Sequence, residues 1–185
     1  MKKKSVAGRI LRLLVFSALL CAISIVCGKY LAFNMGDFMR FSFENLPIIF
    51  AGMAFGPIVG SIVGVVSDLI GCLLVGYAIN PVITAAAGAI GLISGIYYFI
   101  PKKENKPLRI LLISATVAVA HLVGSVIIKS IGLSVFYTMP LYILMLWRLL
   151  NYLIVGTVEG FLLCYLMKNK TLKKQINAIV KERYK

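Results

Sequence analysis

The chain has 185 residues, of which 61% are hydrophobic and only 14% are charged. A soluble domain is nearer half apolar and a quarter charged, so this composition, with a mean hydropathy of +0.96, excludes most soluble folds and indicates a protein embedded in lipid. Twenty Lys and Arg against six Asp and Glu give a net charge of +14. In a soluble protein that excess would suggest nucleic-acid binding, but membrane proteins also collect cations in their cytoplasmic loops.

Apolar runs of about 20 residues mark membrane-spanning helices. By this criterion the sequence predicts an all-α membrane protein with one domain, residues 1–185, and six transmembrane helices in a compact bundle, at approximately 7–28, 46–55, 57–76, 80–100, 108–128 and 140–167. The second helix is short, because about ten residues rise only about 15 Å, half of the hydrocarbon core. We expect it to be flanked by protein or to be extended by residues 41–45.

The positions of the cations predict the orientation. With the amino terminus inside, 16 of the 20 Lys and Arg fall on the inner side, in the N-terminal segment, the Pro101–Pro107 loop and the C-terminal tail. An even number of helices returns both termini to that side. We therefore expect cytoplasmic N- and C-termini in a prokaryotic cell membrane, and we attribute most of the net charge to topology, with no nucleic-acid partner.

Small residues recur at a spacing of four along several predicted helices. Such stripes let helices approach closely in lipid, where the hydrophobic effect contributes little to helix association. The stripes are Ala18 and Ala22; Gly56, Gly60 and Gly64; Ala87, Gly91 and Gly95; and Gly156 and Gly160. We expect most of them to pack inside the protein, and one of them to be open to another membrane protein.

Four cations are not explained by topology. Lys29, Arg40 and Lys129 are predicted at the outer end, the last of them in a turn, and Arg148 lies about 12 Å inside the sixth helix. An intramembrane Arg is costly unless it finds a partner. Asp68 is predicted at a comparable depth, so two hypotheses stay open: a buried salt bridge between the two, or an outward-facing pocket for a ligand that carries a carboxylate.

Further polar and aromatic residues are candidates for such a pocket. Asn151 lies on the same helix face as Arg148, and Asn80 starts the fourth helix. Phe43 and Tyr77 are outer-side aromatics that would cover a flat ring. The sequence has no P-loop and no protease or lipase motif, so energy for transport would come from another subunit.

Two titratable residues are predicted outside this group. Glu159 is expected in the inner half, near Arg9 or Arg12, and His121 is expected to be a hydrogen-bonded packing residue. Neither a metal site nor a cofactor is predicted.

Four segments of the sequence resemble a known protein family. Phe43-Glu-Asn-Leu-Pro-Ile-Ile-Phe-Ala-Gly52, Phe55-Gly-Pro57, Asp68-Leu-Ile-Gly71 and Gly76-Tyr-Ala-Ile-Asn-Pro81 resemble the S components of energy-coupling factor (ECF) vitamin transporters, and within them the folate-specific member. The resemblance implies a subunit that captures folate outside the cell and then joins a transmembrane coupling subunit and two ABC-type ATPases. In that family the first-helix stripe, here Ala18 and Ala22, meets the coupling subunit.

The resemblance also implies a ligand site. Its expected residues are Lys29, Arg40, Lys129 and Arg148 beside the glutamate tail; Asp68, Asn80 and Asn151 beside the pterin edges; Phe43 or Tyr77 over the ring; and Gly71 in the same segment as Asp68. Two alternatives remain open: an S component for another vitamin or precursor (pantothenate, riboflavin or thiamine), or a membrane-embedded enzyme that uses Asp68, Glu159 or His121. The enzyme hypothesis requires titratable residues to converge, whereas Asp68 and Glu159 are predicted at different depths.

Overall fold

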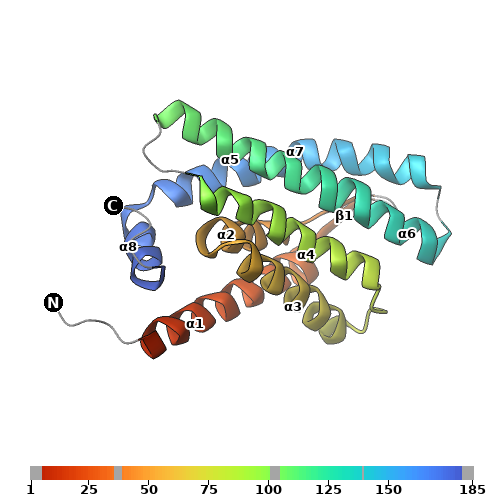
Figure 1. Ribbon diagram of the computed structural model, residues 1–185. Coiled ribbons are helices and arrows are strands. Elements are labelled where there is room, and N and C mark those ends of the chain that lie inside the picture. The colour runs from red at the N-terminus through yellow and green to blue at the C-terminus, as the bar shows by residue number, and fades with distance from the viewer. Residues whose placement is uncertain (1–5, 36–38, 101–104, 139, 181–185) are drawn as a thin grey trace.

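The computed structural model describes residues 6–35, 39–100, 105–138 and 140–180, and these residues form a helical bundle (Figure 1). Its elements in chain order are α1 (Val6–Ile25) with the π-helix η1 (Val26–Tyr30), β1 (Phe33–Met35), β2 (Met39–Phe41), α2 (Asn45–Phe55), α3 (Pro57–Val75), α4 (Pro81–Gly95) with the 3-10 helix η2 (Ile96–Phe99), α5 (Lys106–Ala120) with the π-helix η3 (His121–Ile128), α6 (Lys129–Tyr137), α7 (Leu141–Lys168) and α8 (Lys170–Ile179).

Five helical stretches among the described residues are long and apolar enough to cross a membrane. They are Val6–Tyr30, Pro57–Val75, Pro81–Phe99, Lys106–Phe136 and Leu141–Lys168, and α2 is a shorter apolar helix. These stretches support a multi-pass membrane protein, and the predicted helical class is confirmed. The start of α1 and the whole of α8 lie at the same end of the bundle (Figure 1).

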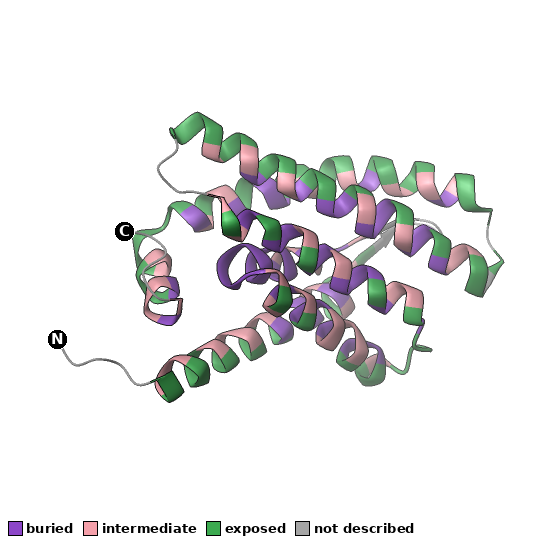
Figure 2. Ribbon diagram, in the orientation of Figure 1, coloured by how far each residue is buried: buried purple, intermediate pink, exposed green. Residues whose placement is uncertain are grey.

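The short helix α2 is enclosed by protein. Every residue of α2 except Leu46 is buried, and α2 contacts α1, α3 and α4 (Figure 2). Because the helix begins at Asn45, residues 41–44 do not lengthen it, and the first of the two expected explanations for its shortness holds. Gly56, with a φ of +100°, ends α2 in a conformation that favours glycine, and Pro57 then starts α3.

Helices α3 and α4 approach each other through their glycines. A Cβ added at Gly91 would lie 2.0 Å from the carbonyl oxygen of Gly60, and one at Gly64 would lie 2.2 Å from the carbonyl oxygen of Ala87. No side chain fits there, so the backbones of α3 and α4 approach each other most closely along these two stripes, as small residues allow between membrane helices. The stripe on α7 is different, because a Cβ at Gly160 would meet nothing within 4 Å.

Most predicted helix boundaries lie within two residues of the observed ones, but the fifth helix is longer than expected. It runs without a break from α5 through η3 to α6 and ends at Tyr137, not at residue 128. The prediction of a turn at Lys129 is therefore wrong. Lys129 lies inside the helix, because a carboxylate from another element compensates its charge there, as described below.

The segment between η1 and α2 contains a small hairpin that the sequence did not predict. Strands β1 and β2 pair antiparallel, with Phe33 opposite Phe41 and Asn34 opposite Arg40. Strand β2 contacts α7, so the hairpin brings the segment before α2 beside that helix.

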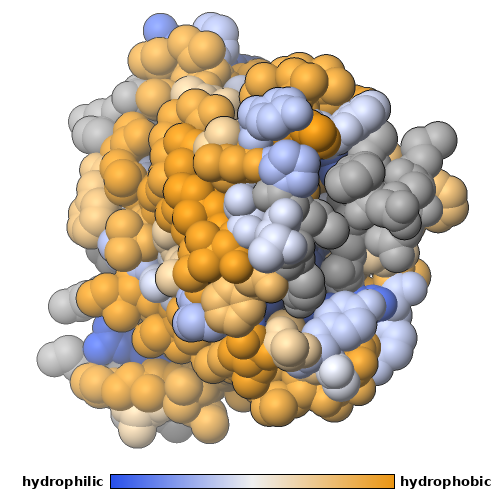
Figure 3. All heavy atoms as spheres, turned by 90° about the vertical axis from the view of Figure 1, so that its right-hand side faces the viewer, coloured by the Kyte–Doolittle hydropathy of each residue, from blue (hydrophilic) through white to orange (hydrophobic). Residues whose placement is uncertain are grey.

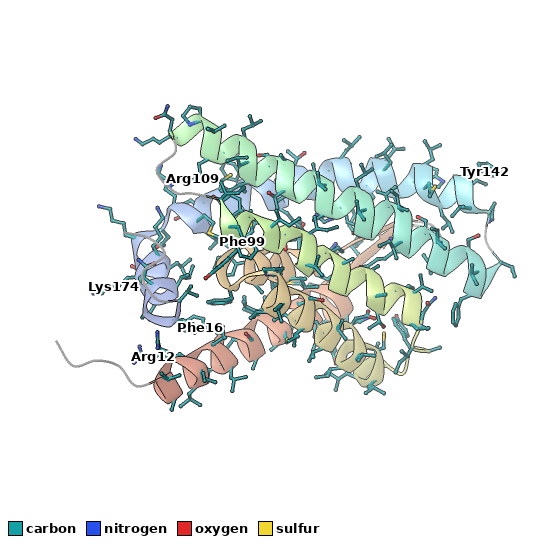
Figure 4. All side chains as sticks on the ribbon, in the orientation of Figure 1. Arg12, Phe16, Phe99, Arg109, Tyr142 and Lys174 are labelled. Carbon is teal, nitrogen blue, oxygen red and sulfur yellow. The ribbon has the colours of Figure 1, made fainter. Side chains whose placement is uncertain are left out.

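The two ends of the bundle differ in charge. We call the end formed by the start of α1, the start of α5, the end of α7 and α8 the basic end; Arg12, Arg109 and Lys174 are labelled there in Figure 4. The opposite end holds the α3–α4 connection, the end of α6 and the start of α7. Figure 3 views the opposite end, where hydrophilic side chains are mixed with hydrophobic ones.

Candidate functional site

Lys29 and Asp68 come together between η1 and α3. Lys29 Nζ lies 4.0 Å from Asp68 Oδ1, and their side chains are 8% and 13% exposed. Lys29 also donates to Cys72 Sγ at 3.6 Å, while Thr84 Oγ1 donates to Asp68 Oδ2 at 2.7 Å. Asp68 therefore links α3 to both η1 and α4, and its carboxylate compensates the charge of a lysine side chain that is only 8% exposed.

Gly71 and Tyr77 shape the surroundings of Lys29. A Cβ at Gly71 would lie 2.7 Å from Lys29 Cε, so glycine at this position leaves room for the lysine stem. The Lys29 ammonium lies 5.6 Å from the centre of the Tyr77 ring, within the range of a cation–π interaction. Both predicted site residues thus adjoin Lys29, and Tyr77 is exposed.

A second ion pair joins Lys129 to Glu44, the residue that precedes α2. The Nζ and Oε1 atoms are 2.5 Å apart, and the side chains are 6% and 23% exposed. Gly28 leaves room for this carboxylate, since a Cβ there would lie 2.7 Å from Glu44 Oε2. Glu44 belongs to the segment from Phe43 to Gly52 that resembles the ECF family, but no role was predicted for its carboxylate. Its position directly before a short and mostly apolar helix was the available signal.

Arg148 does not form a salt bridge with Asp68. In the described part of the chain its Nη1 donates to the main-chain carbonyl of Ser125 at 3.2 Å, and its side chain is half-buried. It also lies close enough to Lys129 for the two cations to repel each other. Ser125 belongs to η3, and π-helical segments are frequent at functional sites. The salt-bridge hypothesis is therefore wrong, because Asp68 binds Lys29 and Thr84 instead.

His121 and Glu159 form a third pair, at the middle of the bundle. His121 Nε2 lies 2.6 Å from Glu159 Oε2 and Nδ1 lies 3.4 Å from Ser125 Oγ, while the imidazole stacks on Tyr152 at 4.6 Å between ring centres. His121 is 3% exposed and Glu159 is fully buried. The expectation of a hydrogen-bonded packing histidine is confirmed. The expectation that Glu159 meets Arg9 or Arg12 is wrong, since Glu159 points to α5–η3.

Asn80 has a local structural role. Its Oδ1 accepts hydrogen bonds from the main-chain nitrogens of Val82 and Ile83, which caps α4, and its Nδ2 donates to the carbonyl oxygen of Gly132 at 3.0 Å. Both ends of the amide are therefore used within the protein, as expected for an Asn at a helix N-cap.

The remaining predicted residues are scattered around this group. Asn151 is buried on α7, three residues after Arg148, and Phe43 is 39% exposed before α2. Arg40 lies in β2 opposite Asn34, and its side chain is outside the described residues. Ala18 and Ala22 are exposed on α1, so this stripe is open, in contrast to the stripes on α3 and α4.

Two of the ion pairs, with Arg148, form what we call the charged cluster: Lys29, Asp68, Glu44, Lys129 and Arg148. It holds three cations and two carboxylates from η1, α3, α6, α7 and the segment before α2. A net positive charge inside membrane-spanning helices suits the capture of an anion. No three His, Cys, Asp or Glu side chains of the described residues group in a way that would hold a metal ion.

A groove of about 440 Å³ lies between α5–η3 and α7, and none of the residues of the charged cluster lines it. Its lining is apolar except for a few polar groups, among them His121, Tyr152 and Thr157. The groove lies at mid-bundle, beside the His121–Glu159 pair, and not at the opposite end where the outward-facing pocket was predicted. That predicted pocket stays a prediction.

A family model and several solved structures resemble this chain. The family model for the ECF transporter substrate-specific component matches residues 12–167. No curated protein matches the sequence. Among solved structures, the chain is similar to the crystal structure of FolT bound with folic acid, with 24% identity over 85% of this chain and 92% of that one and a TM-score of 0.68. It is also similar to the S-component for biotin from an ECF-type ABC transporter, with 16% identity over 95% and 100% and a TM-score of 0.63.

Proposed function

This chain belongs to the substrate-specific components of ECF transporters, the family whose model covers most of its length, and on that premise we propose that it is the folate-binding subunit of an ECF-type ABC importer. It would capture the vitamin outside a prokaryotic cell and deliver it through an energising module. The family and both similar structures are transporter components, not enzymes, so the hypothesis of a membrane-embedded enzyme is abandoned.

The observation that carries the folate proposal is the hydrogen bonding of Arg148. Lys29 and Lys129 each have a protein carboxylate, whereas the described hydrogen bond of Arg148 goes to a neutral carbonyl. A guanidinium inside a membrane-spanning helix is stabilised best by a carboxylate that accepts two hydrogen bonds in one plane. Folate has two carboxylates in its glutamate tail, and likeness to the folic acid complex of FolT supports the same choice.

Other residues would contact the rest of the vitamin. Lys29 and Arg40 are proposed beside the tail, where Lys29 can share its charge between Asp68 and a ligand carboxylate. Asp68 and Asn151 are proposed to bind the polar edges of the pterin. Phe43 and Tyr77 are exposed and available to cover the ring. We leave Asn80 out of this set, because both ends of its side chain are engaged in capping α4 and in binding Gly132.

The experiment compares two ligands with two variants of purified protein. Arg148→Ala should weaken folic acid by roughly 10- to 150-fold, the value of a charge-assisted hydrogen-bonded contact, and should weaken a neutral pterin fragment far less. Arg148→Lys should retain part of the affinity. Arg109→Ala, at the basic end, is the matched control and should leave both affinities unchanged. Equal weakening of folic acid and the pterin fragment would show that Arg148 is structural.

A second candidate is an S component for another vitamin, and the likeness to the biotin component favours testing biotin with pantothenate, riboflavin and thiamine. Biotin has one carboxylate and needs only one of the three cations of the charged cluster. Absorbance, fluorescence and mass spectrometry of ligand that co-purifies with the protein distinguish pterin from flavin and from non-absorbing vitamins. Co-purified biotin, with no affinity for folic acid, would overturn the folate proposal and leave the family unchanged.

The docking partner is proposed to be the transmembrane coupling subunit, which works with two ABC-type ATPases. Ala18 and Ala22 are exposed along α1, and α1 is the least buried of the candidate membrane spans, with 11% of its most apolar window buried. A smooth, open stripe of small residues lets a second helix approach closely. The proposed surface therefore lies on a different part of the molecule from the charged cluster.

A further inference from the structure

The described residues of the basic end carry positive charge without a matching negative charge. Eight Lys and Arg lie there and no Asp or Glu: Arg9, Arg12, Lys106, Arg109, Lys168, Lys170, Lys173 and Lys174. The described acids, Glu44, Asp68 and Glu159, are all paired inside the membrane-spanning part of the bundle. Among the described residues, therefore, no carboxylate compensates these eight cations.

Helix lengths place α8 at the height of lipid headgroups. Helix α7 has 28 residues and is about 42 Å long, which equals the thickness of a bilayer with its headgroup regions. Helix α8 begins after the single residue Asn169, whose Oδ1 accepts hydrogen bonds from the main-chain nitrogens of Thr171 and Leu172. Because this cap sets the start of α8 directly after α7, α8 would lie at headgroup level in a bilayer that α7 just spans.

Helix α8 uses its apolar side within the protein. Ile176 and Ile179 are buried in the main core, where α8 contacts α1 and α7. An amphipathic helix that inserts into lipid has its apolar side free for acyl chains, whereas here only the polar side remains. Lys170 and Lys174, one turn apart, are exposed on that side and line a shallow hollow of about 470 Å³ with Thr171, Gln175 and Ala178.

The opposite flank of α8 holds like charges together. Burial lowers the pKa of Lys173, and the nearby guanidinium of Arg109 lowers it further. Arg12 and Arg109 are labelled at the same end as Lys174 (Figure 4). Repulsion between cations that the fold keeps close is relieved by a bound anion.

We propose that the exposed face of α8 is a docking surface for the phosphate headgroups of anionic phospholipids, with Lys170 and Lys174 as the direct contacts. The charge excess, the height of α8 and the free polar side each favour a lipid headgroup over an acyl chain. This surface would hold the basic end against the inner leaflet, whose anionic lipids attract such lysines. The proposal does not depend on which vitamin is bound.

The experiment measures lipid binding to the purified full chain by native mass spectrometry, with added phosphatidylglycerol or phosphatidylcholine as the probe. A lysine that directly contacts an anionic headgroup should contribute a factor of about five, so Lys170→Gln with Lys174→Gln should weaken phosphatidylglycerol binding about 25-fold. Lys170→Arg with Lys174→Arg should retain it. Vitamin binding, measured on the same samples, reports whether each variant is folded.

The matched control removes two other exposed lysines from the same end, by Lys106→Gln with Lys168→Gln. This variant should lose less than about three-fold, because its lysines lie outside the hollow on α8. Equal losses of phosphatidylglycerol affinity in the two double variants would show that the lipid is attracted by the total charge of the basic end, and would overturn the proposal. Equal affinity for the two lipids would also overturn it. A Lys170→Gln, Lys174→Gln variant that binds lipid normally but fails to assemble with the coupling subunit and ATPases would overturn it too, because the face would then bind protein.

Discussion

The ion pair between Glu44 and Lys129 offers a direct test of the structure. Glu44→Gln removes the charge of the carboxylate and keeps its size, which leaves a lysine that is 6% exposed without its partner inside a membrane-spanning helix. Loss of one member of a buried pair costs about 3–5 kcal/mol, because the other charge stays desolvated. Since Glu44 itself is 23% exposed, water replaces part of the interaction, and we expect the free energy of unfolding to fall by about 3 kcal/mol.

A double variant tests the cause of this loss. Glu44→Gln with Lys129→Met removes both charges, and an uncharged pair of similar size should recover most of the stability. Lys106→Met removes an exposed cation and is the control, with an expected change within about 0.5 kcal/mol.

Thermal unfolding with a thiol-reactive dye suits this chain, because Cys21 and Cys72 are buried free cysteines that become reactive on unfolding. For a protein of this size a loss of 3 kcal/mol corresponds to a decrease in melting temperature of roughly 6–12 °C. If Glu44→Gln melts within a degree or two of the natural sequence, or if the double variant is as unstable as the single one, the ion pair does not stabilise Lys129.

Two further predictions concern the small-residue stripes. Gly91→Ala should strongly destabilise the protein or prevent its folding, because the new Cβ would lie 2.0 Å from the carbonyl oxygen of Gly60. Gly160→Ala has open space around it and should be neutral or should stabilise α7 by up to about 1 kcal/mol. Comparable melting temperatures for the two variants would contradict the α3–α4 packing. Ala18→Trp or Ala22→Trp should leave vitamin binding intact and abolish uptake by the assembled transporter, because both residues are exposed on α1; lost binding in the isolated subunit would show that the stripe belongs to the core.

The membrane-spanning helices were predictable because their signal is local. A run of apolar residues is sufficient to mark a span, and Gly or Pro marks where α3 and α4 begin and end. The fifth helix was predicted too short because Lys129 was taken as a sign of a turn. Its charge is compensated by Glu44, which is 85 residues away in sequence, and no local pattern contains that information.

The pairing within the candidate site was not predictable for the same reason. The sequence suggested Asp68 for Arg148 because both were expected at a similar depth, but depth does not fix which helices are neighbours. Asp68 lies on α3, which packs on α4 and on η1, so Thr84 and Lys29 reach it first. Glu159 was likewise assigned to the nearest cations, whereas the helix packing places it against His121.

The ion pairs also show why some glycines of this sequence lie where they do. A side chain at Gly71, a predicted ligand-site residue, would occupy the space of the Lys29 stem, and Gly28 is placed in the same way against Glu44. Each of the two ion pairs in the charged cluster therefore has a glycine that accommodates one of its charged side chains. Glycine in a helix costs about 1 kcal/mol relative to alanine, whereas breaking a buried ion pair by loss of one partner costs about 3–5 kcal/mol. Arg148 lacks such an arrangement among the described residues, and that difference is the physical reason to assign it, before Lys29 and Lys129, to the carboxylate of a ligand.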